Sequence, residues 1–128
     1  MGLVGYFTAE IGLWSELHTY SGGLGVLAGD HVKSAADAEI DLIGVTLLYR
    51  EGYGRQHIDS DGNQTETFGA IDPADHLIDT GLDLTLPFDD GTIHDKIWKV
   101  EVTGVTGHIL SLIHISDPTI LRRISFSV

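Results

Sequence analysis

A glycine-rich segment near the N-terminus has the residue types and spacing to bind an anion or an oxygen-rich ligand. Residues 20–31 read Tyr-Ser-Gly-Gly-Leu-Gly-Val-Leu-Ala-Gly-Asp-His. Glycine lets a backbone turn sharply and approach a ligand without a Cβ in the way. A helix that follows directs unpaired N–H groups and the positive end of its dipole at the same point. We therefore predict that the backbone here binds a phosphate or a sugar oxygen. The residues concerned are Gly22, Gly23, Leu24 and Gly25.

A strand, a helix and a second strand are the elements that must position this loop. The pattern of apolar residues predicts a buried strand over 3–7, a helix over 24–38 and a second buried strand over 40–48. Residues 8–20 are expected to form a loop with a helical turn. This order is typical of a βαβ unit with parallel strands and a right-handed crossover. The helix is expected to bury Val26, Leu27, Val32, Ala35 and Ala36.

Two later segments have hairpin signals. Asp61-Gly62 and Asp90-Gly91 are each flanked by strand-like residues, and such dipeptides favour tight β-turns. We expect antiparallel strands over 82–88 and 92–102, the second with Ile93, Ile97, Val100 and Val102 as its apolar members. The predicted fold class is therefore α/β with an inserted β-hairpin region.

Residues 110–128 differ in composition from the rest of the chain. They contain one acidic residue, whereas the preceding 109 residues contain eighteen. The segment is either a true terminal strand or a peptide of the kind read when adapter DNA is translated. We favour the second interpretation, take 1–109 as the domain, and exclude 110–128 as a non-native tail.

Charge and composition exclude several partners. The formal net charge of −12 argues against nucleic acid and against an anionic membrane surface, which both attract basic patches. The lack of cysteine excludes disulfides and fits a cytoplasmic protein.

No metal site is expected. Asp59-x-Asp61-x-Asn63 resembles a calcium loop, but Gly62 comes too early and Ala70 stands where a glutamate must close the loop. Five histidines show no metal-ligand spacing: His18, His57, His76, His94 and His108.

The glycine loop also satisfies the dinucleotide fingerprint as Gly23-x-Gly25-x-x-Ala28. In that fold the glycines follow the first strand directly, and an acidic residue ends the second strand. Here more than a dozen residues separate Phe7 from Gly22, and the residues near 43 are apolar. A nicotinamide-binding domain therefore stays the alternative enzyme class, and a tight turn without a ligand is the structural alternative.

Several runs closely resemble the start of the α-glucan phosphorylases, the family that acts on glycogen, starch and maltodextrin. The resemblance covers nearly all of 4–108, and its runs are 4–13, 20–35, 44–56, 61–66 and 96–108. It implies the first part of the N-terminal Rossmann-like lobe of a two-lobed (GT-B type) glycosyltransferase. The implied reaction is reversible phosphorolysis of α-1,4-glucan by inorganic phosphate to glucose 1-phosphate. Such enzymes continue with a strand and a Leu-Asp-Thr-Asp motif, which do not follow His108 here.

The resemblance also implies roles for particular residues. Glu10 matches an acidic residue that lines the glucosyl site, where a carboxylate can bind sugar hydroxyls or stabilise an oxocarbenium-like transition state. The implied cofactor is pyridoxal phosphate, bound through a lysine of the second lobe that this chain lacks. The fragment alone is therefore expected to be inactive, and its oligomeric state stays open. Outside catalysis, a stand-alone carbohydrate-binding module is the alternative.

Weaker candidates have ordinary structural explanations. We expect His31 and Lys33 to be solvated helix residues, and Asp30 to favour the N-terminal half of the helix. The hairpin's polar residues lie where the family approaches substrate, yet an exposed face explains them equally well: Arg55, Gln56, Gln64 and Glu66. Four aromatic residues can stack on sugars, although core packing is their commoner role: Trp14, Tyr20, Tyr49 and Tyr53.

Overall fold

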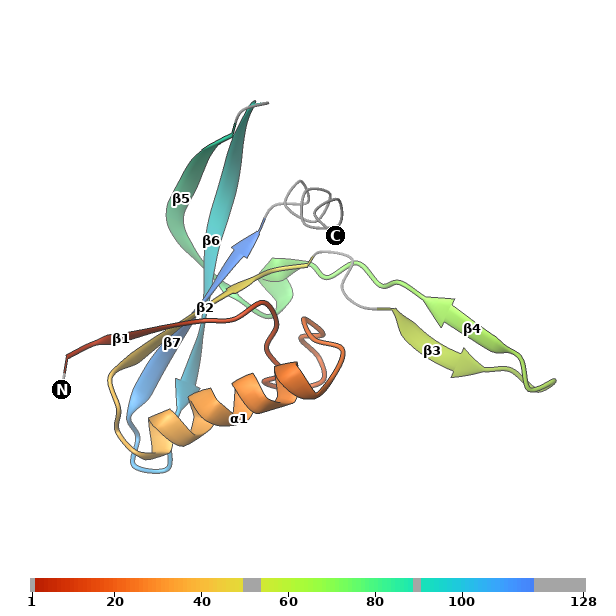
Figure 1. Ribbon diagram of the computed structural model, residues 1–128, viewed down its shortest axis with the longest axis horizontal. Helices are drawn as coiled ribbons and strands as arrows, with labels where there is room; N and C mark the ends of the chain where they lie inside the picture. The colour runs from red at the N-terminus through yellow and green to blue at the C-terminus, as the bar shows by residue number, and fades with distance from the viewer. Residues whose placement is uncertain (1, 50–53, 89–90, 117–128) are drawn as a thin grey trace.

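The computed structural model describes residues 2–49, 54–88 and 91–116 (Figure 1). Within these ranges the fold is a mixed α/β arrangement, which agrees with the predicted class. Its helices are α1 (Gly23–Asp37) and the short 3₁₀ helix η1 (Pro73–Asp75). Its strands are β1 (Val4–Phe7), β2 (Leu42–Leu47), β3 (Arg55–Ile58), β4 (Gln64–Thr67), β5 (Ile78–Phe88), β6 (Gly91–Thr103) and β7 (Ile109–Ser116).

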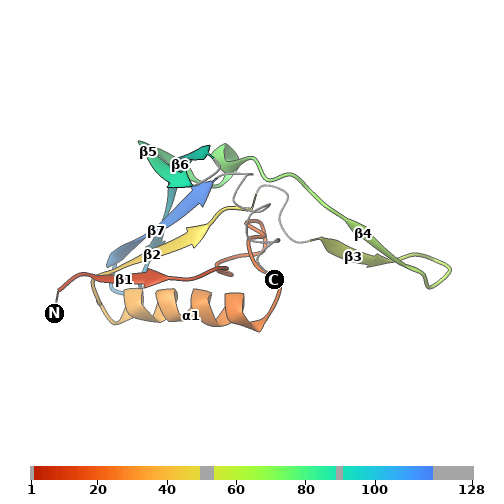
Figure 2. The ribbon, with the colours of Figure 1, turned by 45° about the horizontal axis from the view of Figure 1, so that its top comes forward.

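Five strands form one sheet in the order β1-β2-β7-β6-β5. β1 pairs with β2 in parallel, with Tyr6 opposite Gly44, and β2 pairs with β7 in parallel. The pairs β7–β6 and β6–β5 are antiparallel. Helix α1 lies along one face of the sheet (Figure 2). The predicted strand–helix–strand unit with parallel strands is therefore confirmed.

Helix α1 buries a different stripe of residues from the one expected. Val26 and Leu27 are half or more exposed, so their predicted core positions are wrong, whereas Val32, Ala35 and Ala36 are buried as expected. The buried stripe follows helical spacing along Gly25, Ala28, Gly29, Val32, Ala35 and Ala36. A Cβ at Gly29 would overlap the Gly12 carbonyl group, so the helix packs directly on the backbone of the loop after β1.

Strand β1 is not buried on both faces as predicted. Phe7 has 76% of its surface exposed, and Val4 is also exposed. The reason is topological, because β1 is the edge of the sheet and α1 covers only one face. The core lies instead between α1, the central strands and the loop after β1, and it includes Ile11, Leu17, Val32 and Leu112.

Strand β7 occupies the centre of the sheet, between β2 and β6. Leu110 and Leu112 are buried in the core, and Val45 lies opposite Ile113 in the parallel ladder. Residues 110–116 of the compositionally distinct segment therefore form most of this strand, so the expectation that no strand follows His108 is wrong. Residues 117–128 lie outside the described ranges, and the non-native origin of 110–128 stays a prediction from composition.

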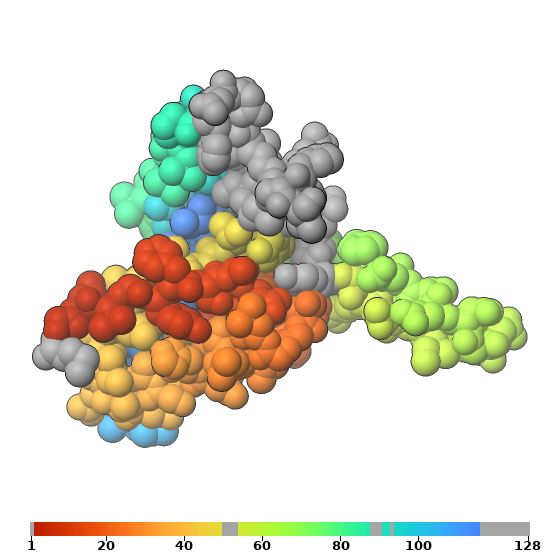
Figure 3. Space-filling model, viewed as in Figure 1, coloured from red at the N-terminus to blue at the C-terminus, as the bar shows by residue number. Residues whose placement is uncertain are grey.

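Both predicted hairpins are antiparallel strand pairs. β3 and β4 form a separate two-stranded sheet that extends away from the body of the molecule (Figure 3). Its turn contains Gly62 at φ 82°, and Asp59 Oδ1 accepts hydrogen bonds from the N–H groups of Asp61 and Asn63. In the second pair, β5 begins at Ile78, earlier than expected, and Asp90 of its turn lies outside the described residues.

Candidate ligand-binding site

Glu10 joins the end of the first strand to the start of the helix. The Ser21 backbone N–H donates to Glu10 Oε2 at 3.0 Å, across 11 residues of chain. Glu10 is only 7% exposed. A buried carboxylate that accepts a backbone hydrogen bond has a fixed position, because losing the bond would leave a desolvated charge. The predicted catalytic carboxylate therefore lies against the predicted binding loop.

Further hydrogen bonds hold the loop after β1 against α1. The Gly12 N–H donates to the Gly25 carbonyl at 2.8 Å, and Thr19 Oγ1 donates to the Ile11 carbonyl at 3.0 Å. Lys33 Nζ donates to the Leu13 carbonyl at 2.8 Å. Lys33 is exposed as expected, yet its ammonium group is used to fasten this loop.

The glycine loop is open to solvent at its first two glycines. Gly22 is the N-cap of α1, with φ −146° and ψ −160°, and no side chain caps the helix. A Cβ at Gly22 or Gly23 would meet no atom within 4 Å, whereas one at Gly25 would overlap Tyr20. Gly22, Gly23 and Gly25 all have negative φ; the described glycines with positive φ are Gly62, Gly81, Gly91 and Gly107. Packing therefore requires glycine at 25, whereas at 22 and 23 its absent side chain leaves room for a ligand.

The electrostatics of the helix start favour an anion or a partly negative oxygen. The first turn of α1 contains no acidic residue, although the chain has a net charge of −12. The N–H groups of that turn and the helix dipole are therefore not neutralised by a carboxylate of the first turn.

Two weaker candidates lie further along the helix. Asp30 is exposed, and the exposed His31 ring lies 4.8 Å from the Tyr6 ring.

Tyr49 lies at the same end of the sheet as Glu10. Its hydroxyl donates to the Ala9 carbonyl at 2.9 Å, which ties the segment after β2 to the segment after β1. Burial raises the pKa of Tyr49, and the nearby Glu10 carboxylate raises it further. The hydroxyl therefore stays protonated and continues to donate. Among the other aromatic candidates, Tyr20 packs on Gly25, and Tyr53 lies outside the described residues.

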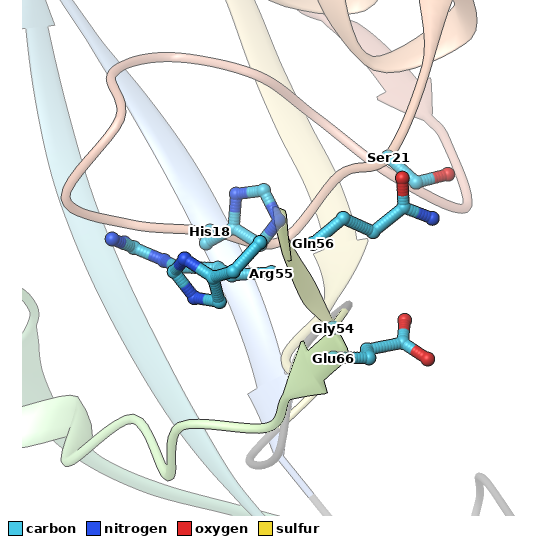
Figure 4. Close-up of a pocket in the computed structure, with 7 residues that line it drawn as sticks. His18, Ser21, Gly54, Arg55, Gln56 and Glu66 are labelled. Atoms are coloured by element: carbon cyan, nitrogen blue, oxygen red, sulfur yellow. The ribbon is translucent and has the colours of Figure 1, made fainter. Parts of the chain in front are cut away.

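A pocket of about 570 Å³ opens beside Ser21 (Figure 4). It is lined by His18, Ser21, Gly54, Arg55, Gln56, His57 and Glu66. Three of the four polar hairpin candidates thus come together, whereas Gln64 does not line the pocket. The sequence pattern could not separate them, since all four are exposed residues of one hairpin. His18 and Ser21 were missed as members because they lie far away in the chain.

Neither a metal site nor a membrane span is found in the described ranges. There, no group of three or more His, Asp or Glu side chains is placed to hold a metal ion. No helix in the same part of the chain has the length and apolar character needed to cross a membrane. The candidate site described above consists of the open N–H groups at the start of α1, the buried Glu10 carboxylate and the polar pocket beside Ser21.

The fold and site define an α/β domain in which a parallel strand–helix–strand unit presents an uncapped, glycine-rich helix start next to a buried carboxylate. By sequence, the chain is related to the α-glucan phosphorylases. It is 39% identical over 112 residues to a maltodextrin phosphorylase of Thermococcus litoralis. It is 53% identical over 70 residues to a glycogen phosphorylase of Mycobacterium tuberculosis and 44% identical over 61 residues to one of Aquifex aeolicus.

These similarities cover about half of this chain or more, but only a small part of each relative. The alignments take in 82%, 55% and 48% of the chain, and 14%, 8% and 9% of the respective enzymes. No protein-family profile matches the chain. These alignments confirm the resemblance to glycogen and maltodextrin phosphorylases. The chain corresponds to one short segment of these much longer proteins.

Proposed function

We propose that this chain is the first part of the N-terminal, Rossmann-like lobe of an α-glucan phosphorylase with the two-lobed GT-B architecture. The parent enzyme transfers glucosyl units between α-1,4-glucan and inorganic phosphate. The observation that carries the proposal is the contact between Glu10 and Ser21 beside the open glycines. It puts a carboxylate beside the open N–H groups of a helix start whose first turn contains no acidic residue.

The proposed chemistry is phosphorolysis at the end of a glucan chain. A phosphate oxygen bonds to the anomeric carbon, the α-1,4 bond breaks, and the products are glucose 1-phosphate and a glucan one unit shorter. The N–H groups at the start of the helix donate to phosphate or sugar oxygens, because they are its first unpaired donors. They belong to Gly22, Gly23, Leu24 and Gly25. Fixed donors of this kind need no reorganisation during the reaction.

Glu10 is the proposed catalytic carboxylate. One of its oxygens is occupied by the Ser21 N–H, which fixes the side chain at the loop. The carboxylate then accepts hydrogen bonds from sugar hydroxyls or stabilises positive charge at the anomeric carbon. Cleavage of a glycosidic bond develops such charge, so a nearby negative group lowers the barrier.

Pyridoxal phosphate is the cofactor that we infer for the parent enzyme. When bound, it supplies a phosphate group that relays a proton. The three lysines of this chain do not fit its covalent attachment: Lys33 binds the Leu13 carbonyl, and Lys96 and Lys99 pair with Asp79 and Glu101. We therefore expect the chain alone to be inactive. The absence of cysteine supports a cytoplasmic parent.

We further propose that the domain comprises residues 1–109 and that 110–128 are not native to it. The support is compositional, since a single acidic residue in the last 19 contrasts with eighteen before them. The centre of a sheet accepts any strand with suitable apolar residues, and 110–116 provide Leu110 and Leu112. The buried His114, which has no hydrogen-bond partner among the described residues, is a poor choice for that position.

A chimera tests the proposed function. Residues 2–109 would replace the aligned segment of the Thermococcus litoralis maltodextrin phosphorylase, and release of glucose 1-phosphate would be measured. We expect activity, and we expect Gly23→Val to lower it about 100-fold or more by blocking the approach to the helix start. Gly69→Val is the matched control, because a Cβ at Gly69 also meets nothing within 4 Å. A folded chimera without activity, or equal losses in both variants, would overturn the proposal.

A further inference from the structure

Strand β1 has a row of backbone hydrogen-bonding groups on its outer side. Within the described part of the chain, β2 is the only strand that pairs with β1. The N–H groups of Val4 and Thr8 donate to carbonyl groups on the side of β2. Backbone groups alternate in direction along a strand, so those of Leu3, Gly5 and Phe7 point away from the sheet. Another strand can therefore pair with β1 along its outer side.

The two edges of the five-stranded sheet differ in how they resist such pairing. At the far edge, β5 contains Asp79 and Asp83, and its pairing with β6 is irregular between these two residues. Charges and irregularities of this kind keep edge strands apart. Residues 2–9 contain no charged residue and no proline, although the chain has a net charge of −12. The β1 edge itself therefore offers no charge repulsion to an approaching strand.

Two large apolar side chains project from the β1 edge on the face of the sheet that α1 leaves open. Tyr6 contacts His31 of α1, and side chains alternate along a strand, so Leu3 and Phe7 lie on the opposite face. These two side chains are 67% and 76% exposed. Pairing at this edge removes their apolar surface from water, which favours association.

Helix α1 adds an apolar stripe beside the same edge, on the other face of the sheet. Leu24 and Leu27 precede His31 by seven and four residues, a spacing that puts all three on one side of the helix. His31 contacts Tyr6 of β1, so this side of the helix lies next to the edge strand. Both leucines are more than half exposed. Apolar surface therefore flanks the β1 edge on both faces of the sheet.

We propose that two copies of this chain associate through antiparallel pairing of their β1 strands, around a two-fold axis at Gly5. In this register Leu3 of each copy lies opposite Phe7 of the other, and Gly5 lies opposite its counterpart. All three residues have outward N–H and C=O groups, so they form hydrogen-bonded pairs. A second copy is the partner that fits, because a two-fold interface uses one self-complementary patch twice.

The proposed register also suits the side chains. A Cβ at Gly5 would lie 3.2 Å from the Phe7 ring, so the glycine leaves room for this ring over the centre of the interface. Residues that lie opposite each other have side chains on the same face, so both α1 helices lie on one side of the joined sheet. The exposed leucines Leu24 and Leu27 of the two helices then face each other across the axis.

Sedimentation equilibrium of the 128-residue chain tests the association. We expect a species of twice the chain mass of 13.8 kDa that dissociates on dilution. Phe7→Lys should raise the dissociation constant about 100-fold or more, because both copies lose an apolar contact. Ile58→Lys is the matched control, because Ile58 is 78% exposed in the β3–β4 hairpin and its replacement changes the net charge equally. The control should leave the dissociation constant unchanged.

Cysteine substitutions test the register, since the chain has no cysteine of its own. A mixture of Leu3→Cys and Phe7→Cys chains should form a disulfide between the two variants under mild oxidation. Hydrogen-bonded antiparallel neighbours have Cα atoms about 5.5 Å apart, which is within the reach of a disulfide. Each variant alone should cross-link much more slowly, because its two cysteines lie at opposite ends of the paired strands.

Three outcomes overturn the interface: a monomer at every concentration, equal weakening by the two lysine variants, or cross-linking of either cysteine variant alone as fast as in the mixture. Circular dichroism checks that each variant is folded. Leu3→Lys replaces Phe7→Lys if the latter unfolds, because Leu3 belongs to the same apolar pair.

Discussion

The Glu10 carboxylate accepts a 3.0 Å hydrogen bond from the Ser21 N–H, and this contact closes the loop between β1 and α1. It defines where the carboxylate lies relative to the glycines. It also makes Glu10 a structural residue as well as the proposed catalytic one. These two roles can be separated, because an amide keeps an acceptor oxygen but loses the charge.

Glu10→Ala should destabilise the fold by about 2 kcal/mol, since it removes a buried acceptor of a backbone N–H group. Glu10→Gln should lose less stability, because its amide oxygen still accepts the hydrogen bond from the Ser21 N–H. Urea unfolding of the two variants and the parent chain measures the difference. In the chimera described above, Glu10→Gln should nevertheless lose most of the activity. Equal stability of all three chains would contradict the anchoring role of Glu10.

Gly29→Ala should destabilise the protein by about 2 kcal/mol, because its methyl group would overlap the Gly12 backbone. A backbone contact cannot be relieved by a side-chain rotation, so α1 must move. Gly23→Ala is the matched control on the same helix. Its methyl group meets nothing within 4 Å, so its stability should stay within about 0.5 kcal/mol of the parent. Thermal or urea unfolding distinguishes the two, and equal midpoints would contradict the close packing of α1 on the loop.

Stability should fall as the pH is lowered from about 6.5 to about 4. Burial of the His114 ring lowers its pKa to about 4. The nearby Leu112 backbone has a smaller, opposite effect on this pKa, although its geometry is not that of a hydrogen bond. In the unfolded chain the same imidazole takes up a proton near pH 6.5. Between pH 6.5 and pH 4 the unfolded chain therefore binds more protons than the folded chain. This difference lowers the free energy of unfolding by about 3 kcal/mol in total.

Urea unfolding at pH 7 and pH 4.5 measures this effect, and His114→Leu is the test variant. The leucine variant should lose most of the pH dependence in this window. Asp59 and Asp79 also have lowered pKa values, from hydrogen bonds to the backbone of Asn63 and Gly81, respectively. The stability that they contribute is lost only as the pH falls below their ordinary values near 4. An unchanged pH dependence in His114→Leu would contradict the assignment.

Asp59→Ala should loosen the β3–β4 hairpin without unfolding the body of the protein. Asp59 Oδ1 accepts the N–H groups of Asp61 and Asn63, and these bonds define the turn. An isolated two-stranded hairpin is marginally stable, so the loss of its turn contacts has a large local effect. Hydrogen exchange should become faster in residues 55–58 and 64–67, while β2 and β6 keep their protection. Asp61→Ala is the control, because no side-chain hydrogen bond of Asp61 is found in the described residues. Equal exchange in both variants would argue against the turn assignment.

Local sequence patterns were sufficient for the elements near the loop. The apolar runs and the glycines located β1, α1 and β2, and the Asp-Gly dipeptides located both strand pairs. The same patterns failed for the helix face, because Val26 and Leu27 are apolar but exposed, while Gly25 and Gly29 make the closest contacts. Glycine has no apolar side chain. A buried helix face that contacts its neighbour through glycine backbone atoms therefore cannot be found from the spacing of apolar residues.

The parallel strand–helix–strand unit, the glycine-rich segment and the relationship to the α-glucan phosphorylases can be read from the amino-acid sequence, since they depend on neighbouring residues and their order. The position of β7 between β2 and β6 and the exposed edge position of β1 became known from the three-dimensional fold. The fold also shows that Gln56 lines the pocket with Ser21 while Gln64 does not. These facts depend on contacts between segments far apart in the chain. Such contacts follow from strand order and packing, which no local spacing records.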